Sequence, residues 1–367
     1  MIFLIILVAI ILLFLLAVLI FVRQPLFGKT PVGNDLQKIQ QSPNFKDGKF
    51  RNRNYTPNLT EGASFFSVLK EFFLERKINR KPPSALPSKK TDLLHLDPEE
   101  NMLVWFGHSS YFIQLDGKKI LVDPVFSGAA SPVKFTTRNF EGSNVYSADE
   151  MPGIDFLFIS HDHWDHLDFE TVMKLKPKIK KIICGLGVAS HFYRWGFDKD
   201  IIIEKDWNEK EILNDGFEVT VLSGRHFSGR GFSRDKSLWV SFFLKTPSMK
   251  IFLGGDSGYD VHFKEIGKEY GPIDLAILEC GQYDKNWKYI HMMPEETFRA
   301  AEDLRSRKLL PVHWGKFALA NHAWDDSIKR VSIAALNKDV ELITPMIGEA
   351  VDLSHHFQTF NEWWERV

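Results

Sequence analysis

The chain has 367 residues, 44% of them hydrophobic, and is therefore long enough to bury one large core or two modest ones. Its 46 basic and 47 acidic residues nearly cancel, and no basic stripe with interleaved aromatic residues stands out, so nucleic acid is not an expected partner. The two cysteines, Cys184 and Cys280, lie in apolar, strand-like segments, which favours buried thiols over a disulfide framework.

Residues 1–22 contain no charged or polar side chain. At about 1.5 Å per residue, a helix of this length crosses a hydrocarbon layer of about 30 Å. A cleavable signal peptide needs a charged leading end and a small-residue cleavage site, neither of which is present, so we expect a single-pass membrane anchor. Arg23, Lys29 and Lys38 follow the span, which favours a cytoplasmic location for the remaining chain.

Residues 23–100 form a second region. Residues 24–62 are rich in Pro, Asn, Gln, Lys and Gly, which predicts a tether or a loosely wrapped arm. Residues 64–78 place phenylalanines and a leucine at helical spacing against charged residues, which predicts an amphipathic helix. This helix either packs on the globular domain or forms a lipid-facing lip near the functional site. A proline-rich break at 81–87 precedes the domain.

Residues 101–367 are predicted to form one α/β domain. Apolar runs at 102–106, 111–115 and 119–123 are typical of strands joined by hairpins. Further strands are predicted to alternate with helices at 168–175, 261–269 and 294–306. Hairpins followed by strand–helix alternation indicate a layered domain with mixed sheets rather than a doubly wound parallel sheet.

A histidine-rich segment follows the apolar run 155–159, where a buried strand is expected to end. Within it, His161, His163, Asp165 and His166 crowd imidazole and carboxylate groups together, which suits zinc or a similar divalent metal. Three more metal-capable residues also come directly after apolar strands: His226, Asp256 and His313. Seven such ligands suit two metal ions bridged by Asp256.

Two cations about 3.5–4 Å apart can hold a bridging hydroxide and polarise a phosphoryl or carbonyl oxygen, so no serine or cysteine nucleophile is required. Asp165 could orient the hydroxide as well as bind metal. Asp123 ends a buried strand and is either an acceptor for the N–H of a ligand imidazole or a turn residue before Pro124.

Five segments carry a resemblance to a known family: 105–110, 121–126, 160–168, 254–259 and 313–321. On these, residues 101–348 resemble the metallo-β-lactamase superfold, and within it the branch of N-acyl-phosphatidylethanolamine-hydrolysing phospholipase D and the ascorbate-phosphate lactonase-like proteins. The resemblance implies a four-layer αββα sandwich and a hydrolase domain over 101–367. It also implies two zinc ions, with manganese or iron as alternatives; the implied ligands are His161, His163 and His226 for one ion, Asp165, His166 and His313 for the other, and Asp256 for both.

Three further residues are candidates for contact with the substrate. His291 precedes a predicted helix start and is either a catalytic, phosphate-contacting residue or a capping-loop residue. His108 suits a role beside the substrate or behind a metal ligand. Trp164, inside the histidine-rich segment, is expected to border the metal pocket as an apolar wall.

The leading hypothesis is a membrane-tethered dinuclear zinc hydrolase that cleaves a phosphodiester in a phospholipid, such as an N-acylated phosphatidylethanolamine, by attack of a metal-bridging hydroxide. A lactonase or another small-ester hydrolase is the alternative enzyme, because the same metals serve attack at a carbonyl. A non-catalytic, membrane-attached metal-binding protein is the alternative of another class. A homo-oligomer is left open.

Overall fold

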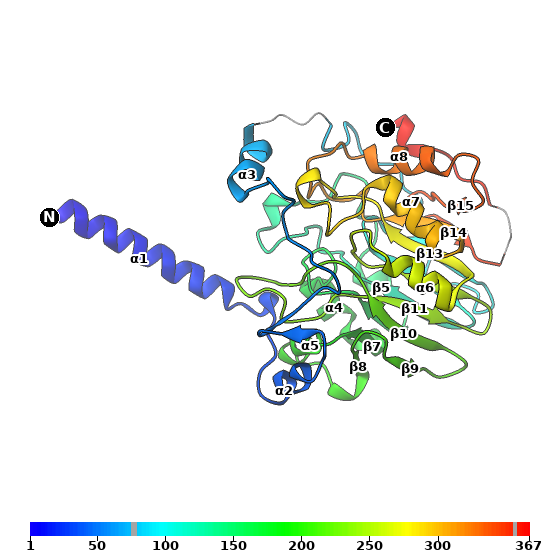
Figure 1. Cartoon of the computed structure of the whole chain (residues 1–367), viewed down its shortest axis with the longest axis horizontal. Helices are drawn as coiled ribbons and strands as arrows, with labels where there is room; N and C mark the ends of the chain where they lie inside the picture. Colours follow the sequence, from blue (N-terminus) through cyan, green and yellow to red (C-terminus); the bar gives the residue numbers. More distant parts are fainter. Residues whose placement is uncertain (75–78, 355–357) are drawn as a thin grey trace.

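The computed structural model describes residues 1–74, 79–354 and 358–367. Two seven-stranded sheets face each other, and helices cover the outer side of each (Figure 1). In each sheet three strand pairs are antiparallel and three are parallel. The expected αββα sandwich of mixed sheets is therefore confirmed.

The first sheet has the order β16-β3-β4-β5-β6-β7-β8. Its strands are β3 (Met102–Trp105), β4 (Tyr111–Leu115), β5 (Lys118–Val122), β6 (Ile154–Ile159), β7 (Ile179–Gly185), β8 (Ile202–Lys205) and β16 (Ala350–Asp352). Helices α4 (Phe169–Leu175) and α5 (Ala189–Arg194) follow β6 and β7 and pack on its outer face.

The second sheet has the order β15-β14-β13-β12-β11-β10-β9. Its strands are β9 (Lys210–Ile212), β10 (Glu218–Ser223), β11 (Val240–Lys245), β12 (Lys250–Leu253), β13 (Ile273–Glu279), β14 (Ser306–Val312) and β15 (Glu341–Leu342). Its outer face is covered by α6 (His262–Tyr270), α7 (Pro294–Asp303) and α8 (Asp326–Ala335). The helix expected over 294–306 ends earlier because Arg305 adopts a left-handed conformation (φ 55°), and Ser306 begins β14.

The main core lies between the two sheets. Phe158 of β6 meets Phe242 of β11 edge to face, with ring centroids 5.0 Å apart. The central parallel strands are covered on both sides, which explains why β6 and β13 read as nearly continuous apolar runs. Cys184 and Cys280 are buried free thiols, as expected.

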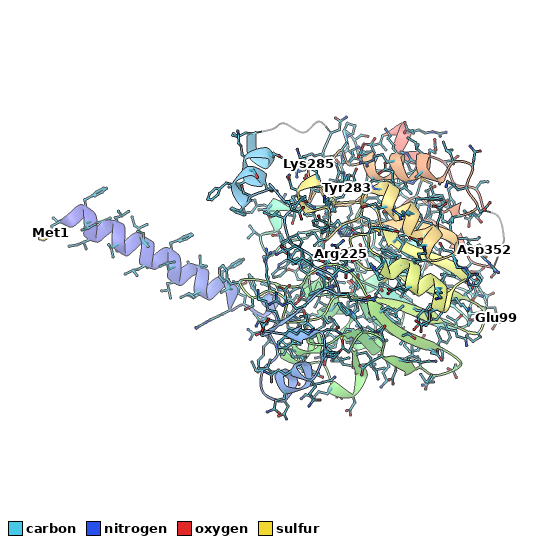
Figure 2. All side chains as sticks on the ribbon, viewed as in Figure 1. Met1, Glu99, Arg225, Tyr283, Lys285 and Asp352 are labelled. Carbon is cyan, nitrogen blue, oxygen red and sulfur yellow. The ribbon has the colours of Figure 1, made fainter. Side chains whose placement is uncertain are left out.

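Helix α1 (Ile2–Val22) projects away from the domain, and none of its residues is buried (Figures 1 and 2). Among the described residues, α1 is the one helix that is long enough and apolar enough to cross a membrane. Its exit is fixed to the domain, because the Phe21 ring packs on Phe27 and the Phe27 ring packs on Trp164.

The arm after α1 is packed rather than loose. It contains α2 (Asn34–Gln40) and the hairpin β1 (Phe45–Lys46) and β2 (Lys49–Phe50), and it buries Ile39 and Phe50. Asn52 donates from its amide to the carbonyl of His226 at 2.8 Å and accepts from the backbone N–H of His226 at 3.1 Å. The polar composition of residues 24–62 suggested a tether or a loosely wrapped arm. In the structure, polar side chains of this arm form hydrogen bonds with the backbone of the domain.

Helix α3 (Phe65–Leu74) corresponds to the expected amphipathic helix, whose last positions, 75–78, lie outside the described residues. Glu71 on this helix faces the domain, where it accepts from Asn286 Nδ2 at 3.0 Å. Phe65, Phe66 and Leu74 are 67%, 80% and 73% exposed. The helix therefore docks through a polar side chain and presents apolar side chains to the surroundings.

We expect Phe50→Ala to lower the free energy of unfolding by about 3–5 kcal/mol, because the ring is 1% exposed and its loss leaves a cavity. Urea unfolding of the detergent-solubilised full chain, followed by tryptophan fluorescence, measures this. Tyr55→Ala is the matched control on the same arm, because Tyr55 is 84% exposed, and it is expected to change stability by less than about 0.5 kcal/mol. Equal, small effects of both changes would show that the arm is not part of the folded core.

Candidate metal centre

The seven predicted ligands lie at the ends of strands along one edge of the two sheets. His161, His163, Asp165 and His166 follow β6, and the others follow β10, β12 and β14 as His226, Asp256 and His313. With His108, Glu279 and His291, they form three overlapping groups in which the nitrogen and oxygen atoms lie within 4.8 Å of one another. The fold thus brings together residues as far apart in the chain as His108 and His313, about 205 positions.

One part of the centre consists of three imidazoles. His163 Nδ1 lies 2.9 Å from His161 Nε2 and 3.2 Å from His226 Nε2. His226 uses its other nitrogen, Nδ1, to donate to the carbonyl of Ile290 at 2.8 Å. The Nε2 of His226 therefore carries a lone pair that points at the neighbouring imidazoles.

The tautomer of His161 is fixed by a hydrogen bond in the same way. The Ser160 hydroxyl donates to Asp123 Oδ2 at 2.6 Å, so it accepts from His161 Nδ1, which lies 3.0 Å away. The Nε2 of His161 then also carries a lone pair directed toward His163. Lone pairs that converge on one point repel each other unless a cation lies between them.

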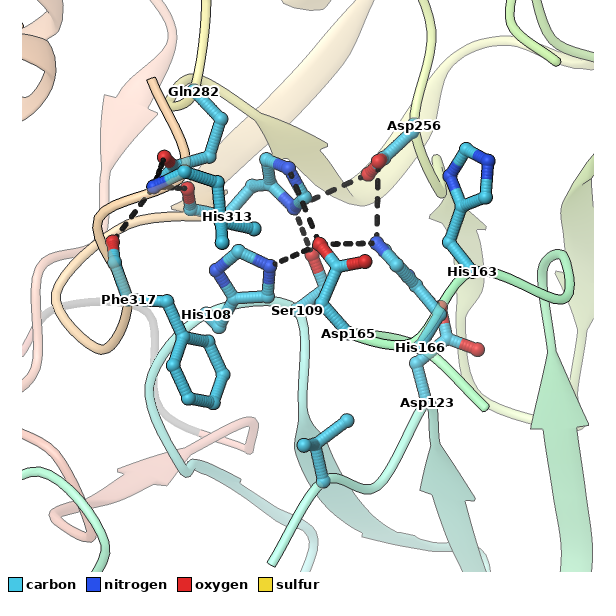
Figure 3. A network of polar contacts seen from close by, with 12 residues as sticks. His108, Ser109, Asp123, His163, Asp165, His166, Asp256, Gln282, His313 and Phe317 are labelled. Carbon is cyan, nitrogen blue, oxygen red and sulfur yellow. Dashed lines mark hydrogen bonds and ion pairs between the residues drawn. The ribbon is translucent and has the colours of Figure 1, made fainter. Parts of the chain in front are cut away.

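The second part of the centre is built on Asp165, His166 and His313 (Figure 3). His166 Nδ1 donates to Asp123 Oδ2 at 2.8 Å, which turns Nε2 inward. That Nε2 faces Asp256 Oδ2 at 3.2 Å and Asp165 Oδ2 at 3.7 Å, yet it makes no hydrogen bond within the described chain. An unbonded nitrogen at this depth is typical of a metal ligand.

Asp256 lies between the two parts. Its Oδ2 is 3.8 Å from His161 Nε2 and 3.7 Å from His226 Nε2, while its Oδ1 is 3.2 Å from His313 Nδ1. A carboxylate within reach of both sets of nitrogens has the placement that a bridging ligand requires.

Burial sets the charge of the centre. It lowers the pKa of His163 to about 4 and the pKa values of His161 and His226 well below the usual range, so these rings are neutral at pH 7. Burial also raises the pKa of Asp256 to about 6. For Asp165, the neighbouring His166 and the hydrogen bond from His108 outweigh burial and hold the pKa below its usual range. Neutral imidazoles and an ionised carboxylate are the forms that bind a divalent metal.

Glu279 was missed by the sequence reasoning. It ends β13, is fully buried, and accepts from the backbone N–H groups of Ser257 and Met292 at 3.0 and 3.2 Å. Its Oε2 lies 2.6 Å from His291 Nδ1. The signal was available, because Glu279 directly follows the apolar run 275–278, as each predicted ligand follows its own strand.

Two predicted substrate residues lie elsewhere. His108 is fully buried, and its Nε2 lies 2.8 Å from Asp165 Oδ2, so it supports a predicted ligand from behind. Trp164 turns away from the centre, where its ring packs on Phe27 and under the Arg230 guanidinium at 3.9 Å. The structure thus does not place Trp164 as a wall of the metal pocket, because the chain leaving α1 covers its ring.

A cavity of about 490 Å³ opens in front of the centre. Five of the predicted ligands line it: His163, Asp165, His226, Asp256 and His313. The remaining lining residues are six with apolar side chains, Leu59, Phe65, Phe227, Trp287, Ile290 and Leu319, and four with polar side chains, Asn58, Arg234, Gln282 and His291. Such a cavity suits a molecule with an apolar part and a polar reacting group.

The family model described as "Beta-lactamase superfamily domain" matches residues 118–314. The chain belongs to the beta-lactamase superfamily. An uncharacterized protein of Mycobacterium tuberculosis is 35% identical over 329 residues, which cover 89% of this chain and 88% of the relative.

An N-acyl-phosphatidylethanolamine-hydrolyzing phospholipase D of Caenorhabditis elegans is 29% identical over 350 residues, covering 89% of this chain and 98% of the relative. Among solved structures, Igni18, a metallo hydrolase from the archaeon Ignicoccus hospitalis, matches with a TM-score of 0.53 at 21% identity. This match covers 70% of this chain and 99% of Igni18. These findings make the chain a metal-dependent hydrolase of the metallo-β-lactamase fold.

We expect the purified full chain to carry a transition metal. His163→Ala should reduce the metal content by at least about half, because the change removes a predicted ligand nitrogen that lies beside those of His161 and His226. Elemental analysis by mass spectrometry, normalised to protein, measures this. His95→Gln is the control, because His95 is an exposed histidine that pairs with Asp92. A wild-type protein that is folded and takes up no transition metal would contradict the assignment.

Proposed function

We propose that the chain is a membrane-tethered dinuclear zinc hydrolase that cleaves a phosphodiester in a phospholipid such as an N-acylated phosphatidylethanolamine. The observation that carries this proposal is the largely apolar cavity in front of the histidine and aspartate cluster, with Arg234 in its lining. The similarity to the phospholipase D of C. elegans supports the same substrate class.

Membrane attachment is supported by two apolar elements. Every residue of α1 lies outside the core, and α3 exposes Phe65 and Phe66 while its Glu71 faces the domain. Both helices lie on the same side of the molecule (Figure 1). Phe65 also lines the cavity, so the apolar surface of α3 continues into the proposed substrate site. A bilayer in contact with this side would cover the exposed side chains and present lipid at the cavity.

Bound divalent ions would supply Lewis acidity and lower the pKa of water toward neutrality. The zinc assignment follows from the donor set, in which neutral imidazoles predominate and carboxylates supply the remainder. Asp165 is held ionised with His108 behind it, so it can orient an attacking water.

Glu279 and His291 are proposed to serve the leaving group. Burial raises the pKa of Glu279 and lowers the pKa of His291, so the pair retains a shared proton between Oε2 and Nδ1. Whichever atom holds that proton, His291 Nε2 carries a hydrogen. It can therefore donate to a phosphoryl or leaving-group oxygen in the cavity.

The test is hydrolysis of an N-acylated phosphatidylethanolamine in mixed micelles by the full chain loaded with zinc. We expect release of phosphatidic acid and the N-acylethanolamine, detected by mass spectrometry, and a loss of at least about 100-fold in His163→Ala. Absence of phosphatidic acid together with turnover of a soluble lactone would reassign the chain to the lactonase alternative.

Arg234 is expected to bind the phosphate of the substrate. Its guanidinium lies over the Phe227 ring at 5.2 Å, and both residues line the cavity. Arg234→Gln should raise KM for the phosphodiester about 10- to 100-fold, because it removes a charge-assisted hydrogen bond, while Arg234→Lys should retain part of the affinity. Arg307→Gln is the control, because Arg307 lies at the start of β14, the opposite end from His313, and should leave KM unchanged. Equal KM values for Arg234→Gln and wild type would remove Arg234 from the site.

A further inference from the structure

A second cavity, of about 230 Å³, lies where α1 enters the domain. One wall is formed by Val22, Phe27 and Lys29 from the chain that leaves α1, and the other by the loop that contains Arg230 and Lys236. This volume holds several water molecules of about 30 Å³ each, and so has room for one phosphate group.

The buried cation of this cavity is Arg230, which is 4% exposed. Its Nη1 donates to the carbonyls of Asp162 and Leu167 at 3.0 and 2.6 Å, and its Nη2 donates to the carbonyl of Leu26 at 2.8 Å. Its Nε has no hydrogen-bond partner in the part of the chain that the structure describes. Carbonyl dipoles thus surround a charge that is ordinarily paired with an anion when it is buried.

Two lysines add to this charge. Lys29 is exposed, and Lys236 Nζ donates to the carbonyl of Gly48. Within the described ranges, neither these lysines nor Arg230 forms an ion pair with a carboxylate. One carboxylate, that of Asp162, also lines the cavity, and its oxygens are occupied, because they accept from the Gly229 backbone at 2.7 Å, from Ser237 Oγ at 2.8 Å and from His191 Nε2 at 3.1 Å.

The position of the cavity suggests the source of an anion. Val22 is the last residue of α1 and lines the cavity, so the cavity lies at the level where a membrane-spanning α1 would leave the bilayer. Arg23 and Arg194 lie at the same exit, where Arg194 donates to the carbonyl of Arg23 at 2.7 Å. Basic residues directly beside a membrane span attract anionic phospholipids.

We propose that this second cavity binds a phosphate oxyanion, supplied by the headgroup of an anionic phospholipid, between Lys29, Arg230 and Lys236. The source of the oxyanion rests on the proposed membrane attachment of α1. Asp162, which lines this cavity, stands between His161 and His163 in the chain, and the Arg230 guanidinium lies over the Trp164 ring. A headgroup held there would fix the orientation of the domain on the bilayer, apart from the site of hydrolysis.

The experiment uses the metal-loaded full chain in nanodiscs of equal parts phosphatidylcholine and phosphatidylglycerol, a bilayer that contains none of the proposed N-acylated substrate. The protein is then moved into a neutral detergent, and the lipid it retains is measured by native mass spectrometry. We expect the wild type to retain phosphatidylglycerol selectively. The double variant Lys29→Gln/Lys236→Gln should retain at least about tenfold less of this lipid. Lys264→Gln/Lys268→Gln is the matched control, because these lysines are exposed on α6, away from α1 (Figure 1).

A parallel titration with inorganic phosphate distinguishes the two sources of the oxyanion. If the protein retains lipid and this retention depends on the two lysines, the oxyanion is the lipid headgroup. If the protein binds inorganic phosphate in a lysine-dependent way and retains no lipid, the oxyanion at this site is free phosphate. Retention of both lipids in bilayer proportion, or equal retention by the two double variants, would overturn the site. Lys29→Glu, a single change at an exposed position, provides the same test if the double variant does not fold.

Hydrolysis in micelles separates this proposal from the proposed function. If the lipid adduct is absent and phosphatidic acid is still released, only the second site is wrong. If the adduct depends on the two lysines and no phosphodiester is cleaved, only the proposed substrate is wrong.

Discussion

The structure depends on the electrostatic cost of collecting histidines and carboxylates in a buried space. His161, His226 and His166 each direct one nitrogen outward to a serine, a carbonyl or a carboxylate, and this leaves the other nitrogen facing inward. Without a metal, His166 takes up a proton, because Asp256, Asp165 and Asp123 outweigh burial and raise its pKa, while His161 Nε2 and His226 Nε2 keep inward lone pairs that share one neighbour, His163 Nδ1. A cation converts this repulsion into attraction, which makes metal binding and local stability one property of the fold.

The two sheets supply the rigidity that such an arrangement needs. Strand ends along one edge deliver the ligands, and left-handed backbone at His108, Asp123 and His313, with φ of 55°, 42° and 70°, turns the chain sharply there. Non-glycine residues adopt this conformation at a cost of about 1–3 kcal/mol each, and such strain persists only where the surrounding structure enforces it. The arm contributes as well, because Asn52 holds both backbone groups of His226.

Much of this could be read from the sequence, because strand ends are marked by apolar runs and metal-capable residues directly after them are conspicuous. The layered mixed sheets were predicted from hairpins followed by strand–helix alternation, and the grouping of the seven side chains was predicted from their positions directly after apolar strands. Glu279 obeys the same rule but resembles any acidic residue after a strand, and only its burial beside His291 reveals it. The directions of Trp164 and His108 and the tight packing of the arm depend on tertiary contacts, which composition and spacing do not encode.

The most direct measurement of the central claim is anomalous diffraction from crystals of the full chain, collected at the absorption edge of the metal that it carries. A dinuclear centre predicts two peaks about 3.5–4 Å apart, one beside His161, His163 and His226 and the other beside His166 and the remaining ligands, with Asp256 contacting both. A single peak at another place, or no peak within the cluster of a fully loaded protein, would contradict it.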